Sequence, residues 1–98
     1  MNTEIKAVHF TLHDDSREYL EKKISRIHNA ENIITDLLFT LTHERDFSAE
    51  ATVNLRWGVS LHVAESDFDL NAAIDKMMDT LVAKIAKEKD KKEKVKGR

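Results

Sequence analysis

The residues best suited to chemistry in this sequence are lysines near its C-terminus. Lys84, Lys87, Lys91 and Lys94 recur at spacings of three, four and three, so on a helix they form one stripe. A lysine ammonium is a compact point charge that releases condensed counterions when it binds a nucleic-acid backbone. The stripe therefore predicts a phosphate-binding surface. The alternative is a solvated helix face on which neighbouring glutamates pair with these lysines, with Glu88 and Glu93 as the nearest partners.

The charge of the chain is unevenly distributed. Residues 1–83 hold 8 of the 16 Lys and Arg and 15 of the 18 Asp and Glu, a net charge of −7. Residues 84–98 hold the other 8 basic residues and 3 acids, a net charge of +5. Such asymmetry indicates a basic end that meets nucleic acid or another anion. Upstream, Lys23 and Arg26 share one face of a predicted helix, and two helices side by side would join both groups into one basic surface.

The sequence contains few features that indicate catalysis. The chain has no cysteine, no glycine-rich phosphate loop and no H-E-x-x-H motif, and its five histidines are scattered. His9 and His62 both fall on the polar face of predicted strands and would meet only if the first and last strands were neighbours. We therefore predict no enzyme, no catalytic residue, no metal and no cofactor. A small hydrolase built on that histidine pair is the most distant alternative.

The elements that must position these residues follow from periodicity, because the chain has no proline and only two glycines. Alternating apolar residues predict strands at 5–12, 33–43, 49–57 and 59–65, the first with Val8, Phe10 and Leu12 on one side. Helical spacing predicts one helix from Asp15 to residue 28 or 29 and another from residue 70 to about residue 92. We expect side-chain caps at Asp15 for the first helix and at Asp67 and Asp69 for the second.

This order predicts an α+β fold, a β-α-β-β-β-α two-layer sandwich with two helices packed on one face of a four-stranded mixed sheet. The first strand is expected to pair parallel with the second through a crossover that contains the first helix. Residues 1–98 form a single domain in which the lysine-rich segment 88–98 is expected to fray. No apolar run reaches the roughly 20 residues of a membrane span, and no signal-peptide core is present, so we expect a soluble cytoplasmic protein.

Several motifs resemble those of the ribosome hibernation promoting factor and ribosome-associated inhibitor family, also known as sigma-factor modulation proteins. Arg17-Glu18-Tyr19 followed by Lys23, Arg26 and Ile27 resembles the first-helix pattern of the family. His62-Val63-Ala64-Glu65 and the run from Asp69 to Asp75 (DLNAAID) resemble its last strand and the start of its second helix. Lys87-Glu88-Lys89-Asp90-Lys91 resembles its lysine-rich ending.

The resemblance implies a non-enzymatic protein that binds the small ribosomal subunit and occupies the channel where messenger and transfer RNA would lie. It also implies a short family member without the C-terminal dimerisation domain, with no membrane and no small-molecule substrate. The candidate ribosomal RNA contacts that it implies are Lys23, Arg26, Lys84, Lys87, Lys89 and Lys91, with Arg17 as a weaker candidate.

Two features of the chain depart from the family pattern. Thr80 and Ala83 stand where the family usually places basic residues, and the body of the chain is acidic, whereas RNA binding calls for a positive field. An alternative function therefore stays open. In it, a divergent family member acts as a protein-interaction or weakly dimerising module, through a sheet edge or the polar sheet face, without binding ribosomes.

Overall fold

The computed structural model describes the backbone of residues 1–96 and the side chains of residues 1–91. Its elements are, in chain order, β1 (Asn2–Val8), α1 (Asp14–Ile24), the 3-10 helix η1 (Ser25–Ile33), β2 (Ile34–His43), β3 (Phe47–Leu55), β4 (Ser60–Asp67) and α2 (Leu70–Lys96). The predicted β-α-β-β-β-α order is confirmed, with η1 as a continuation of the first helix.

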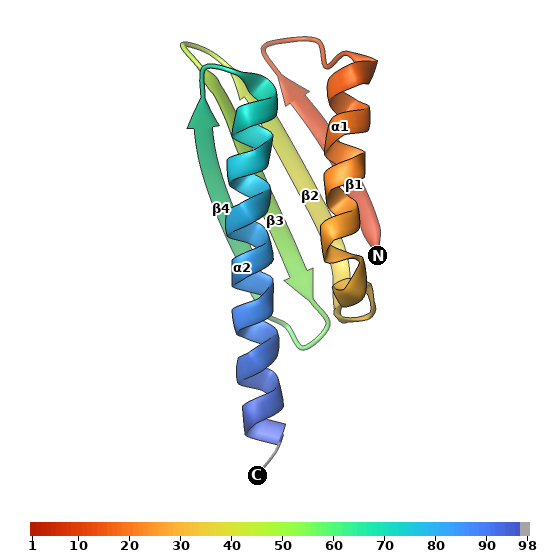
Figure 1. Cartoon of the computed structure of the whole chain (residues 1–98). Coiled ribbons are helices and arrows are strands. Elements are labelled where there is room, and N and C mark those ends of the chain that lie inside the picture. Colours follow the sequence, from red (N-terminus) through yellow and green to blue (C-terminus); the bar gives the residue numbers. More distant parts are fainter. Residues whose placement is uncertain (97–98) are drawn as a thin grey trace.

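The four strands form one mixed sheet in the order β1-β2-β3-β4. As predicted, β1 pairs parallel with β2, whereas β2–β3 and β3–β4 pair antiparallel. Both helices cover the same face of the sheet, so the molecule is the predicted two-layer sandwich (Figure 1). Helix α2 packs on β3 and β4 and lies beside α1, while η1 contacts β2.

The core lies between the helices and the sheet because alternate strand residues point to that one face. Leu37, Phe39 and Leu41 of β2 are almost fully buried, as are Ala51 and Val53 of β3. Helix α2 contributes the matching apolar stripe, which comprises Ala73, Ile74, Met77, Met78, Leu81 and Ile85. The helices are therefore held to the sheet mainly by hydrophobic burial.

The first strand ends earlier than the alternation predicts. His9 has a backbone φ of +67°, a left-handed conformation that ends the extended strand at Val8. Phe10 and Leu12 follow the strand and pack against the edge of the core from the connection to α1. The prediction that they lie within the strand is thus wrong.

The first helix also differs from its prediction at both ends. Its N-cap is His13, which makes no side-chain capping bond, and Asp15 lies inside the first turn, so the predicted Asp15 cap is wrong. Regular α-helix ends at Ile24, and the chain continues as η1 to Ile33. The tighter 3-10 winding changes the direction in which these residues point and brings Ile27, Ala30 and Ile33 into the core.

The second helix begins as predicted and extends further. The Asp69 side chain accepts a hydrogen bond from the Ala72 amide at 3.0 Å, and Asp67 accepts one from the Asp69 amide at 3.0 Å. The predicted Asp69 cap is thereby confirmed, whereas Asp67 bonds the amide of the cap residue itself and holds the turn before the helix, so the prediction that it caps the helix is wrong. The backbone of α2 continues to Lys96, beyond the predicted end near residue 92. The side chains of residues 92–98, including that of Lys94, lie outside the described residues, and fraying of segment 88–98 stays a prediction.

Candidate nucleic-acid interface

The two helices are joined by a row of polar contacts that involves two of the candidate RNA-binding residues. The Tyr19 hydroxyl donates a 2.6 Å hydrogen bond to Asp75 Oδ1, and Lys23 Nζ lies 3.3 Å from the same oxygen. Further along, Arg26 donates a 2.7 Å hydrogen bond to Asp79 Oδ1. The bond to Asp75 raises the pKa of both the Tyr19 hydroxyl and the Lys23 ammonium above their ordinary values.

These contacts interrupt the continuous basic surface that the sequence predicts, because Asp75 and Asp79 neutralise cations of α1 and η1. The pairs are open to solvent, since Arg26 and Asp79 side chains are 41% and 68% exposed. Exposed ion pairs contribute only about 0.2–1 kcal/mol to stability. An RNA phosphate could therefore replace either carboxylate at a small cost in free energy. The two aspartates thus compete with RNA for Lys23 and Arg26 but do not prevent RNA from binding.

A second set of contacts ties α2 to the edge strand β4. Lys84 Nζ donates a 2.9 Å hydrogen bond to the carbonyl oxygen of His62, and Lys76 Nζ lies 3.3 Å from the carbonyl oxygen of Ser66 and 2.9 Å from Asp67 Oδ2. The ammonium groups of these two α2 lysines lie at the exposed edge of the sheet, where lysines oppose pairing with a strand of another chain. Lys84 thus has a structural contact, which makes it a less available phosphate ligand than its position in the stripe suggests.

The remaining candidates lie in the C-terminal part of α2. Lys87 and Lys91 are exposed, Lys89 is partly buried, and none of the three makes a salt bridge or hydrogen bond within the described part of the chain. Their ammonium groups are therefore free to meet an external anion.

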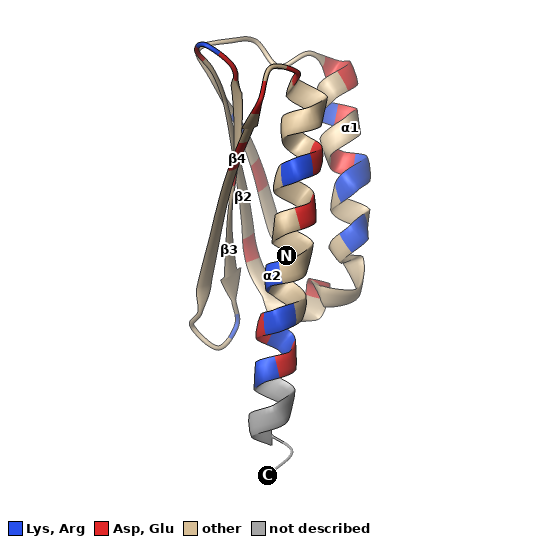
Figure 2. Cartoon of the chain, turned by 60° about the vertical axis from the view of Figure 1, so that its left-hand side comes forward, with Lys and Arg blue, Asp and Glu red and all other residues tan. Residues whose placement is uncertain are grey.

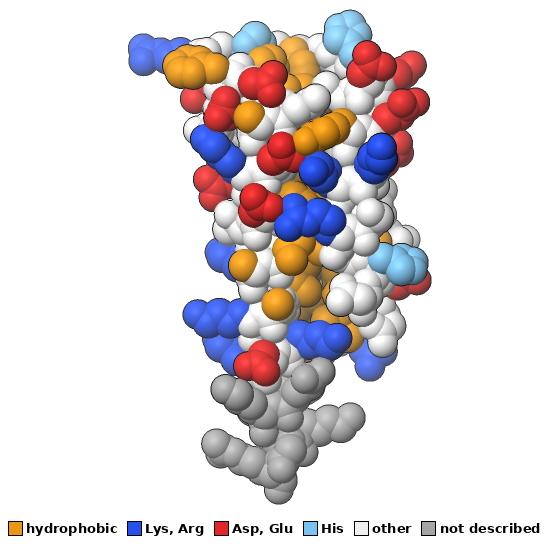
Figure 3. All heavy atoms as spheres, in the orientation of Figure 1, with side chains coloured by type: hydrophobic (Ala, Val, Ile, Leu, Met, Phe, Trp, Pro, Cys, Tyr) orange, Lys and Arg blue, Asp and Glu red, His pale blue; other side chains and the backbone are white. Residues whose placement is uncertain are grey.

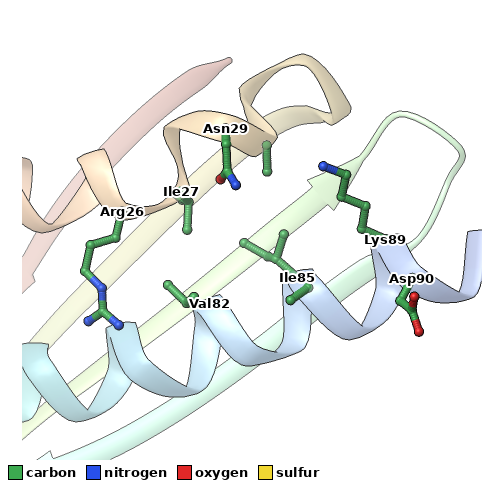
Figure 4. Close-up of a pocket in the computed structure, with 9 residues that line it drawn as sticks. Arg26, Ile27, Asn29, Val82, Ile85, Lys89 and Asp90 are labelled. Carbon is green, nitrogen blue, oxygen red and sulfur yellow. The ribbon is translucent and has the colours of Figure 1, made fainter. Parts of the chain in front are cut away.

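Lys87 and Lys91 share one face of α2 with Lys84, whereas Lys89 lines a groove between η1 and α2 (Figure 4). The lysine stripe predicted from the sequence is therefore present in the structure from Lys84 to Lys91, whereas Lys89 lies on a different surface.

The charged side chains lie mainly on the helices and the loops (Figure 2). Blue Lys and Arg residues gather on α1 and on the lower part of α2, and acidic residues dominate the opposite end, where the loops meet the start of α1. In the space-filling view, acidic groups predominate in the upper part of the helical face and basic groups in its middle and lower part, although one basic side chain also lies at the upper corner (Figure 3). The molecule therefore has electrostatically distinct ends.

The histidine pair considered for catalysis does not form. His62 lies in β4 and His9 follows β1, and these strands are the opposite edges of the sheet. His62 instead contacts Thr52 Oγ1 at 3.1 Å and Glu50 Oε1 at 3.5 Å. Among the described side chains no group of three or more His, Cys, Asp or Glu could hold a metal ion. No helix within the described residues is long and apolar enough to cross a membrane.

Comparison with known proteins agrees with this fold. Residues 3–93 match the family described as sigma 54 modulation protein / S30EA ribosomal protein. The chain belongs to this family. Its members are ribosome-associated factors rather than a known class of enzyme.

Two relatives and one structural neighbour illustrate what the chain is similar to. The ribosome hibernation promotion factor of Deinococcus radiodurans is 36% identical over 77 residues, which is 72% of this chain but only 40% of that protein. The N-terminal domain of Thermus thermophilus Protein Y has a TM-score of 0.76 and 30% identity, covering 87% of this chain and 96% of that one. A ribosomal subunit interface protein from Coxiella burnetii has a TM-score of 0.84, covers 92% of this chain and 99% of its own, and at 21% identity supports the fold alone.

The sequence did not lead us to predict that carboxylates of α2 pair with basic residues of α1 and η1. Asp75 and Asp79 are four residues apart on α2, and Lys23 and Arg26 are three residues apart on the facing helix. Matching these two spacings could have indicated the contacts. The sequence also did not predict the groove that Lys89 lines together with Val82 and Ile85.

Proposed function

We propose that this protein binds the small ribosomal subunit by contacting ribosomal RNA and occupies the channel for messenger and transfer RNA. The observation that carries the proposal is the group of lysines without a partner among the described residues, Lys87, Lys89 and Lys91, at the basic end of a chain of the S30EA family. Lysines on a helix suit recognition of structured RNA through phosphate contacts. Three further residues are expected to contribute less to RNA binding, because phosphate must first displace their partners within the protein. They are Lys23, Arg26 and Lys84.

Binding of this kind suits a protein that blocks initiation sterically and protects idle ribosomes in the cytoplasm. It needs no reacting group, no metal and no cofactor, since occupancy of the channel alone excludes messenger RNA. The acidic end would then face away from the phosphates, because like charges repel across the interface.

Cosedimentation of the whole chain with purified small ribosomal subunits tests this function. At low salt we expect the protein to travel with the small subunits and to be released as salt rises, because released counterions drive phosphate binding. Subunits loaded beforehand with messenger RNA and initiator transfer RNA should bind less protein, and purified large subunits serve as the comparison. Protein that stays at the top of the gradient at low salt would contradict the proposal.

The alternative, a protein-interaction module, is favoured by one specific observation at the other end of the molecule. Phe68 is 86% exposed between Asp67 and Asp69, whose side chains accept backbone hydrogen bonds that hold the turn in place. Exposed aromatic residues on ordered turns are common anchors of protein interfaces, and the flanking carboxylates would suit a basic partner.

Replacing Phe68 by serine separates the two functions. We expect Phe68→Ser to change the free energy of unfolding by less than about 0.5 kcal/mol, because the ring is mostly in solvent. RNA binding through the helices predicts unchanged cosedimentation with small subunits for this variant. Loss of cosedimentation would show that the ribosome is bound through the acidic end, and the proposed RNA contacts would then be wrong.

A further inference from the structure

The groove between η1 and α2 has an apolar floor, formed by the edge of the core together with Val82 and Ala86. It has a volume of about 340 Å³ and is lined on the η1 side by Ile27 and Ala30 and on the α2 side by Val82, Ile85 and Ala86. The groove exists because α1 ends at Ile24 and the tighter η1 follows, which leaves part of the apolar side of α2 uncovered. Ile27, Ala30 and Ile85 are almost fully buried, so the part of the floor that a ligand can reach is Val82, which is partly buried, and Ala86, which is exposed.

Cationic side chains stand at the two ends of this floor. Figure 4 shows Arg26 at one end and Lys89 at the other, with Ile27, Val82 and Ile85 between them. Asp79 engages one terminal nitrogen of Arg26 and so orients the guanidinium, which keeps further N–H donors. The carboxylate of Asp90 points away from the floor in the same view.

One polar group faces the groove between the cations. Asn29 lies on the η1 rim, and its amide offers both donors and an acceptor. An apolar floor, an amide on one rim and a cation at each end match the parts of a nucleotide in single-stranded RNA. The base has apolar faces and a polar edge, and a phosphate flanks it on either side.

We infer that this groove binds one unstacked nucleotide of a structured RNA, with the base against Val82 and Ala86 and the flanking phosphates at Arg26 and Lys89. Asn29 contacts the edge of the base. The inference rests on the proposed function, which it deepens by giving RNA a second point of attachment besides Lys87 and Lys91. A base inside a duplex cannot reach the groove, so the RNA must be a loop, a bulge or a single strand.

Methyl and amide NMR of the labelled whole chain tests the groove directly. The probes are a single-stranded oligoadenylate hexamer, a blunt RNA duplex and a hexaglutamate peptide. We expect the hexamer to shift the methyl signals of Ile27, Val82 and Ile85, and the duplex to leave them unchanged. Equal shifts with hexaglutamate would overturn the nucleotide assignment, since an acidic peptide would then suffice.

A substitution that fills the groove gives the second readout. Ala86→Trp should weaken hexamer binding at least fivefold, whereas Ala64→Trp, an equal change on the exposed open face of β4, should bind like the parent chain. Lys89→Ala removes one phosphate contact without adding bulk, so it tests the groove even if Ala86→Trp fails to fold. We expect this variant to weaken hexamer binding about threefold or more.

The failures of the two proposals are distinguishable. Signals near Lys87 and Lys91 that shift while the groove methyls stay fixed would overturn the groove site and leave ribosome binding intact. Groove shifts from a chain that does not cosediment with small subunits would overturn the proposed function and keep the nucleotide site.

Discussion

Leu81→Ala should lower the free energy of unfolding by about 2–5 kcal/mol, the range measured for removing a fully buried leucine side chain. Leu81 is fully buried in α2, between Met77 and Met78 on one side and Ile85 on the other. The facing residues of the sheet cannot move in to fill the space, because their strands, β3 and β4, are held in place by their hydrogen bonds within the sheet. A urea titration followed by circular dichroism measures the change.

An exposed leucine provides the matched control. Leu38 lies in β2 on the open face of the sheet, where it is 37% exposed, and Leu38→Ala should cost less than about 1 kcal/mol. Similar losses for the two variants would contradict the packing described for α2. The stability of this region also matters for binding, since Leu81 and Ile85 anchor the part of α2 that carries the free lysines.

The sequence predicts the fold well because most of its strands are half-buried. In β3, Ala49, Ala51, Val53 and Leu55 point to the core and alternate with polar residues, so the period of two is unambiguous. Helix α2 is equally clear, with a capping aspartate and a long apolar stripe. The first strand is less clear, because its alternation continues through Phe10 and Leu12 although the backbone of His9 ends the strand.

The arrangement of the candidate site could be predicted only in part. The lysine stripe follows from spacing within one helix, and the structure keeps Lys84, Lys87 and Lys91 on one face. The contacts of Lys23 with Asp75 and of Arg26 with Asp79 depend on how far one helix is shifted along the other, across about fifty residues of sequence. The groove depends on the change from α-helix to 3-10 helix at Ser25. No capping residue or glycine in the sequence indicates this change.

Replacing Lys87 and Lys91 together by alanine should have the largest effect on ribosome binding. Both side chains are exposed, and neither is paired within the described residues. Each phosphate contact contributes about 0.7–0.9 to the slope of log K against log salt, so the double variant should lose about 1.5 of that slope. Its affinity for small subunits at low salt should fall roughly tenfold or more. Alanine is the best helix former, so α2 should be retained, which circular dichroism can verify.

A double variant with the same change of charge separates local contacts from the overall field. Lys6 lies in β1 and Arg45 between β2 and β3, and both are exposed and lie outside the helices. Lys6→Ala with Arg45→Ala should weaken binding only slightly and leave the salt slope unchanged, because a charge far from the interface acts through the screened field. Equal losses in both double variants would mean that net charge governs binding. A salt slope that stays unchanged in the Lys87 and Lys91 variant would show that α2 does not contact the phosphates, and the acidic end with Phe68 would then be the surface to investigate.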